Sequence, residues 1–176
     1  GGSQALSLAF ASIFNSGDEI IISSPNFISY FYLSAFFGLR VIEIERKNDF
    51  SPDITKIKNS ITAKTKAILI NSPNNPTGYT LSDSSLQRIS KTAKKHNSLI
   101  ITDEVYASFF PKKKMILDYC PERTVRIDAR SKVERSTGLR FGDMFISKEA
   151  NEYITNNILH EHSLNGLDFK QYLLYA

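Results

Sequence analysis

Short apolar runs, each closed by turn-forming residues, recur along the whole chain. Most are rich in isoleucine, leucine and valine with little alternation of polar residues, which is typical of parallel strands buried on both faces. We therefore predict six strands. They cover residues 20–22, 41–44, 67–70, 99–102, 124–127 and 144–146.

Helical periodicity appears between these runs. Residues 3–14 carry an apolar face at a spacing of three to four residues, and Gly17 provides a stop just beyond them. A second helix is expected to be capped by Ser82, and a third to cover residues 151–159 with Asn151 as its cap. This alternation predicts an α/β fold. Its sheet is doubly wound and mostly parallel, with helices on both faces and ligands beyond the carboxyl ends of the strands.

Composition narrows the class of protein. The chain has 176 residues, of which 41% are hydrophobic, enough for one sizeable core. The net charge is +4, but the lysines lie in short runs and form no basic stripe among aromatic residues, so we predict no nucleic-acid partner. The one cysteine, Cys120, excludes an internal disulfide and fits a reducing compartment.

The ends of the chain and its longest aromatic run bear on its location. Residues 27–37 are aromatic-rich but fall well short of the roughly 20 apolar residues that a membrane span needs. No secretory signal pattern is present, so we expect a cytoplasmic protein without a membrane partner. Residue 1 is a glycine inside what reads as a phosphate loop, so the chain reads as part of a longer protein.

Four short motifs carry the candidate chemistry, and three of them come directly after a predicted strand. Each has a plainer explanation when taken alone: a glycine helix cap, a turn, a strand-end acid or a surface lysine. The motifs are Gly2-Ser3-Gln4-Ala5-Leu6, Asn75-Pro76-Thr77-Gly78, Asp103-Glu104-Val105-Tyr106, and Ser131-Lys132 followed by Arg140.

The residue types suit a ligand that carries both an anion and a cation. A glycine-rich helix start presents free amides and the positive end of the helix dipole, which favour a phosphate. Arg140 offers paired donors to the same kind of group. Asp103 ends an apolar strand, so its carboxylate needs a cationic or hydrogen-bonding partner. Glu104 faces the other way along an extended segment, so only one acid is expected to enter the site.

The order and spacing of these motifs resemble the fold-type I pyridoxal-phosphate enzymes, specifically the class I/II aminotransferases, from about residue 1 to 147. Asp103 follows Asn75 by twenty-eight residues and precedes Lys132 by twenty-nine. The resemblance implies that residues 1–150 are the large, cofactor-binding domain without its N-terminal beginning. Residues 151–176 would be a helical C-terminal segment of the same domain, and the small domain would be absent.

The resemblance also implies a role for each site residue. Lys132 would form a Schiff base with pyridoxal 5'-phosphate and shuttle a proton, and Asp103 would pair with the pyridine nitrogen. Asn75 and Tyr106 would contact the ring oxygen, and Phe27 would stack on the ring. The residues expected at the phosphate are Gly2, Ser3, Gln4, Ser131 and Arg140.

The implied activity is amino-group transfer between an α-amino acid and a 2-oxo acid, in a homodimer. Two alternatives stay open: a lyase, decarboxylase or synthase on the same scaffold, and a catalytically inactive fragment. The chain departs from the family pattern at Ala129, where a hydroxyl is common, and in the charged residues on either side of Lys132. His160 and His162 are too poorly placed on a helix to bind a metal, so no metal is expected. A dinucleotide-binding domain is disfavoured because no Gly-x-Gly-x-x-Gly motif follows a strand.

Overall fold

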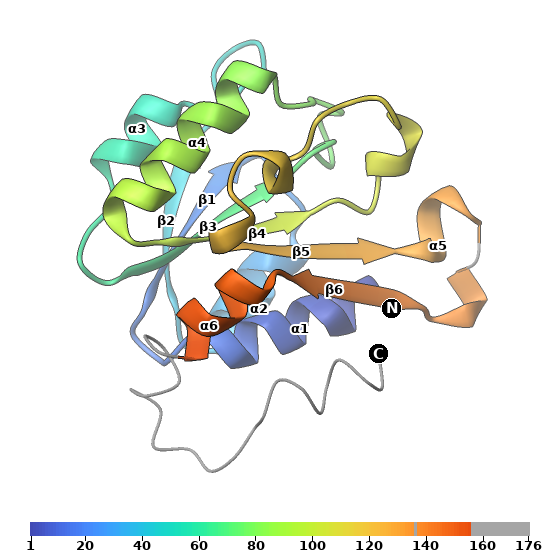
Figure 1. Cartoon of the computed structure of the whole chain (residues 1–176), viewed down its shortest axis with the longest axis horizontal. Coiled ribbons are helices and arrows are strands. Elements are labelled where there is room, and N and C mark those ends of the chain that lie inside the picture. Colours follow the sequence, from blue (N-terminus) through green and yellow to red (C-terminus); the bar gives the residue numbers. More distant parts are fainter. Residues whose placement is uncertain (136, 156–176) are drawn as a thin grey trace.

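A single six-stranded sheet organises the chain in this computed structural model, which describes residues 1–135 and 137–155 (Figure 1). The strand order is β2-β1-β3-β4-β5-β6. The first five strands are parallel and β6 runs antiparallel to β5, which confirms the predicted doubly wound, mostly parallel fold. The strands are β1 (Glu19–Ser24), β2 (Arg40–Glu45), β3 (Thr65–Asn71), β4 (Leu99–Asp103), β5 (Thr124–Ala129) and β6 (Gly142–Ile146).

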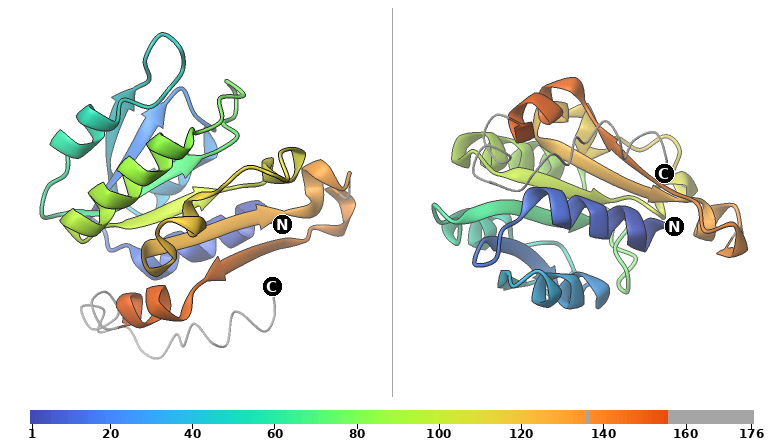
Figure 2. Two further views of the ribbon diagram at one scale, coloured as in Figure 1. Left: turned by 45° about the horizontal axis from the view of Figure 1, so that its top comes forward. Right: turned by 90° about the horizontal axis from the view of Figure 1, so that it is seen from below.

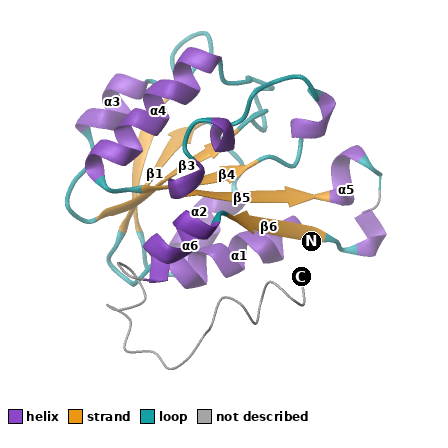
Figure 3. Cartoon of the chain, viewed as in Figure 1, coloured by secondary structure: helices purple, strands orange, loops and turns teal. Residues whose placement is uncertain are grey.

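Helices cover both faces of the sheet (Figures 2 and 3). One face packs against α1 (Gly2–Ile13) and α2 (Ser29–Phe36), and the other against α3 (Ile54–Asn59) and α4 (Asp83–His96). The shorter elements follow β4 and β5. They are η1 (Ala107–Phe109), η2 (Ile116–Asp118), η3 (Pro121–Arg123), α5 (Arg130–Val133), η4 (Thr137–Leu139) and α6 (Lys148–Ile154).

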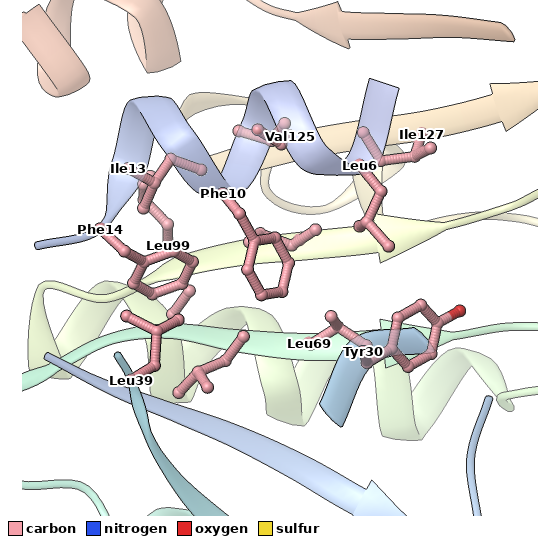
Figure 4. Packing of buried hydrophobic residues seen from close by; sticks show 14 of the residues in the cluster. Leu6, Phe10, Ile13, Phe14, Tyr30, Leu39, Leu69, Leu99, Val125 and Ile127 are labelled. Carbon is pink, nitrogen blue, oxygen red and sulfur yellow. The ribbon is translucent and has the colours of Figure 1, made fainter. Parts of the chain in front are cut away.

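The strands contribute to two hydrophobic cores because successive side chains point to opposite faces. In β4, Leu99 and Ile101 pack on the α1 side while Ile100 packs on the α4 side. On the α1 side, Phe10 is fully buried and lies near the middle of the cluster (Figure 4). Burial on both faces explains why the inner strands β1, β3 and β4 contain continuous apolar runs in the sequence.

Two of the three predicted helices are confirmed and the third is displaced. In α4 the Ser82 hydroxyl accepts a hydrogen bond from the amide of Ser85 at 3.2 Å, as expected for a cap. The third helix, α6, begins at Lys148, and the predicted cap Asn151 lies inside it. Ser147 caps it instead, because its hydroxyl comes directly after β6 and accepts from the amide of Ala150 at 3.0 Å. Residues 156–159 of that prediction lie outside the described part of the chain.

Helix α2 was not predicted. It occupies the aromatic-rich run, where apolar side chains fill almost every position and hide the helical period. Tyr32 and Phe36 point outward with 69% and 81% of their surface exposed, so hydrophobicity does not mark the buried face. Within the described residues, no helix is both long enough and apolar enough to cross a membrane.

The start of α1 lies unusually close to β6. A Cβ atom added at Gly142 would lie 2.4 Å from both the carbonyl carbon of Gly1 and the amide nitrogen of Gly2. Only a glycine fits at such a distance from backbone atoms. This contact holds the first turn of α1 beside the end of β5, where the chain continues into α5.

Candidate functional site

A cavity of about 210 Å³ lies beyond the carboxyl ends of the parallel strands, next to the first turn of α1. It brings together every residue predicted for the site except Gln4. That side chain is exposed and does not line the cavity. The lining residues are Gly2, Ser3, Leu6, Phe27, Tyr30, Asn71, Asn75, Asp103, Val105, Tyr106, Ala129, Ser131, Lys132, Thr137 and Arg140.

Asp103 provides a buried carboxylate that lines the cavity. It is the last residue of β4 and only 7% of its surface is exposed. The hydroxyl of Tyr30 donates to its Oδ2 at 2.6 Å, and the amide of Val105 donates to its Oδ1 at 3.2 Å. Burial raises the pKa of Asp103, while these two hydrogen bonds lower it. Both donors are neutral, and no cationic side chain among the described residues pairs with this carboxylate.

Two aromatic residues between β1 and β2 form one wall of the cavity. Phe27 lies just before α2 and Tyr30 in its first turn, and both residues line the cavity. Their centroids are 5.6 Å apart and the rings are nearly perpendicular, at 84°. Tyr30 is fully buried, and its hydroxyl points away from the core towards Asp103 (Figure 4).

The turn after β3 holds Asn75 through Asn71. The Asn71 side chain donates to the carbonyl oxygen of Asp103 at 3.0 Å and accepts from the amide of Asn75 at 2.7 Å. Asn71 is also paired in register with Asp103 across β3 and β4. This bridge fixes the turn against the buried acid and leaves the Asn75 side chain at the cavity, near Tyr106.

Two cationic side chains also line the cavity. Lys132 in α5 and Arg140 after η4 are exposed side chains that line it, together with Ser131. A Cβ atom added at Gly1 would lie 3.0 Å from Nη2 of Arg140, so the guanidinium lies against the backbone at the start of α1. No described side chain caps this helix, and its first amides are open to a ligand. The start of α1 together with Arg140 therefore suits an anion.

Several lining residues were not found by reasoning from the sequence. Tyr30 lies one helical turn after Phe27, a spacing that would have indicated it had α2 been recognised. Asn71 ends β3 just as Asp103 ends β4, and that shared position is its signal. Val105, Thr137 and Leu6 carry no polar pattern that would have marked them.

The two adjacent acids separate as expected. Asp103 enters the cavity, whereas Glu104 lies on the other side of the sheet with Arg126. Nowhere in the described part of the chain do three or more histidine, cysteine or acidic residues gather as a metal site. His160 and His162 lie outside the described residues.

A family profile and several known proteins resemble this chain. The profile described as aminotransferase class I and II matches residues 1–158. A probable aspartate aminotransferase of Methanocaldococcus jannaschii is 35% identical over 98% of this chain and 48% of its own length. The aspartate aminotransferase of Thermotoga maritima is 37% identical over 85% of this chain and 41% of its own.

Solved structures agree with this similarity. The aspartate aminotransferase of Thermus thermophilus, solved with maleate, superposes with a TM-score of 0.81 at 33% identity, over 88% of this chain and 41% of that one. The Thermotoga maritima enzyme superposes with a TM-score of 0.80 at 38% identity, over 88% and 42%. The chain therefore spans less than half the length of these relatives.

Proposed function

Because the chain belongs to the class I and II aminotransferase family, we propose that it forms the cofactor-holding part of a pyridoxal 5'-phosphate-dependent aminotransferase. The observation that carries this proposal is the set of charged groups that line one cavity. They are a buried carboxylate without a cationic partner among the described residues, an amine and a guanidinium.

The cavity residues fit this cofactor. A ring nitrogen that carries a proton would complete the environment of Asp103, whose burial otherwise disfavours its charge. A phosphate would be received by the open amides of α1 and by Arg140, which lies against them. Gly2 also fits the cofactor, because a Cβ atom there would lie 3.1 Å from Cβ of Ala129 and narrow the cavity beside the start of α1.

Each side chain then has a defined task. Bound pyridoxal phosphate supplies a reactive aldehyde carbon and a ring that withdraws electrons from it. Lys132 would supply the amine that holds the cofactor and would carry a proton to and from the substrate. Asp103 would pair with the ring nitrogen and favour its protonated form. Asn75 and Tyr106 would hold the ring oxygen, and Phe27 would pack against the ring.

The proposed substrates are an α-amino acid and a 2-oxo acid. Aspartate is the first donor to test, because the relatives named above are aspartate aminotransferases. A homodimer and a cytoplasmic location belong to the same proposal and rest on the resemblance alone. Gel filtration with light scattering measures the oligomeric state. Product analysis for ammonia or carbon dioxide distinguishes transamination from lyase or decarboxylase chemistry on the same scaffold.

The proposal is tested by titration with pyridoxal phosphate followed by borohydride reduction and peptide mapping. We expect a visible absorbance band and a label on Lys132. Both are lost in Lys132→Ala and retained in Lys148→Ala, which removes an exposed lysine of α6. A label spread over surface lysines, or no band at all, would mean that this chain does not hold the cofactor.

A further inference from the structure

A second cluster of charged residues lies outside the cavity, on the other side of the sheet from the Asp103 side chain. Glu104 directly follows β4, Arg126 and Asp128 lie in the neighbouring strand β5, and the Arg126 side chain contacts both acids. Nε of Arg126 donates to Oε2 of Glu104 at 2.8 Å, and Nη2 of Arg126 donates to Oδ2 of Asp128. The side chain of Glu104 is only 3% exposed and that of Arg126 is 28% exposed.

Each end of this cluster is attached to a part of the cavity. Glu104 directly follows Asp103, and its amide donates to the carbonyl oxygen of Ile127 at 2.8 Å. Asp128 lies four residues before Lys132, and its Oδ1 accepts from the amide of Ala129 at 2.7 Å, where the chain leaves β5 for α5. Arg126 therefore joins the backbone segment of the buried acid to that of the lysine.

The link formed by Arg126 depends on its positive charge, because acidic side chains surround it. Across β5 and β6, Asp128 lies opposite Asp143, whose Oδ1 is buried without a partner among the described residues. Burial raises the pKa of Glu104 and of Asp128, and Arg126 lowers both. Without Arg126, two acidic side chains would lose their close cation and repel one another at the point where the two segments meet.

We propose that Arg126 is a positioning residue, which holds the strand end bearing Asp103 in place against the turn bearing Lys132. The role of Arg126 in catalysis rests on the proposed function, but its contacts with Glu104 and Asp128 are present without any cofactor. Arg126 does not line the cavity, so it acts through Glu104 and Asp128 and not by contact with a ligand.

Two substitutions of Arg126 test this role against one control. Arg126→Met keeps the length of the side chain and removes its charge, and Arg126→Lys keeps the charge but cannot donate from a planar fork to both acids. Lys94→Met is the control, because it breaks an ion pair of 2.6 Å with Glu122 near the start of β5, away from the cavity. Each is compared at a temperature where circular dichroism shows all variants folded.

The readouts are amide hydrogen exchange in the cofactor-free protein and the dissociation constant for pyridoxal phosphate. In Arg126→Met we expect faster exchange over residues 104–106 and 129–132, and affinity weakened roughly tenfold, as for groups coupled in one ion-pair network. Arg126→Lys should recover part of both changes. Adding Asp128→Asn to Arg126→Met should also recover part, because it removes one of the unpaired acids. Lys94→Met should leave both readouts unchanged.

The outcomes separate this inference from the proposed function. If the wild-type protein fails to bind pyridoxal phosphate, the proposed function is wrong, and hydrogen exchange still decides whether Arg126 holds the two segments. If the wild type binds but Arg126→Met shows the same exchange over both segments, the inference is overturned. Faster exchange with unchanged affinity also overturns it, since Arg126 would then stabilise the sheet without positioning the site.

Discussion

Asp103 shows how a single residue can be predicted in position but not in its surroundings. A polar residue that ends an apolar strand is visible in the sequence, and so is its spacing to Lys132. The donors that hold it are not, because Tyr30 comes from a distant helix and the amide of Val105 from the local bend of the chain. The position of the acid was therefore predictable from the sequence, whereas the groups that control its charge became known only from the structure.

Tyr30→Phe should alter that charge. Loss of the hydroxyl removes a hydrogen bond that lowers the pKa of Asp103, so this pKa should rise further. A carboxyl with a raised folded-state pKa stabilises the fold most below its unfolded pKa and loses this contribution as pH rises. The variant should therefore be destabilised by about 2 kcal/mol near pH 8 and by less near pH 4. Urea unfolding at the two pH values measures this difference.

The matched control is Tyr32→Phe, in the same helix but with an exposed side chain. It should unfold as the wild type does at both pH values. Equal destabilisation of Tyr30→Phe at the two pH values would contradict the expected link to the charge of Asp103. Carbon NMR of the Asp103 carboxyl would show the rise in its pKa directly.

At the scale of elements, the strands were easier to predict than the helices. All six strands form where apolar runs indicated them, and the signal is simplest in β1, β3 and β4, which are buried on both faces. Helices α1 and α4 have one polar side and were found. Helix α2 was missed because its outer face also carries aromatic residues, and α6 was displaced because Ser147 and Asn151 are both acceptable caps.

Gly142→Ala should separate two elements that meet at the site. Its new methyl group would clash with backbone atoms of Gly1 and Gly2, which cannot rotate away, so β6 must move from α1. Overpacking of this kind costs about 1–3 kcal/mol. We expect a corresponding loss of stability in urea, together with weaker binding of pyridoxal phosphate.

Gly138→Ala provides the comparison within η4. A Cβ at Gly138 would meet no atom within 4 Å, and this substitution should change neither property appreciably. If Gly142→Ala is as stable as Gly138→Ala, the close contact between α1 and β6 does not matter to the fold.

At the scale of the whole molecule, the cavity depends on segments far apart in the sequence. Its walls come from α1, the start of α2, the ends of β3 and β4, and the segment from Ala129 to Arg140. A ligand held by all of them can bind only the assembled sheet. Pyridoxal phosphate at about one hundred times its dissociation constant should therefore raise the free energy of unfolding by about 2.7 kcal/mol. Chemical unfolding with and without the cofactor measures this, and Lys132→Ala should show a smaller increase.

The two adjacent acids at the end of β4 also affect the register in which this strand pairs with its neighbours. Ile100 and Ile101 are both isoleucines, and their side chains pack in opposite cores. A shift of β4 by one position would therefore exchange them at little cost in apolar packing. The same shift would turn Glu104 towards Tyr30 and Asp103 towards Arg126, where their side-chain lengths no longer match. Because β4 is apolar on both faces, the different lengths of Asp103 and Glu104 at its carboxyl end select one register of the strand.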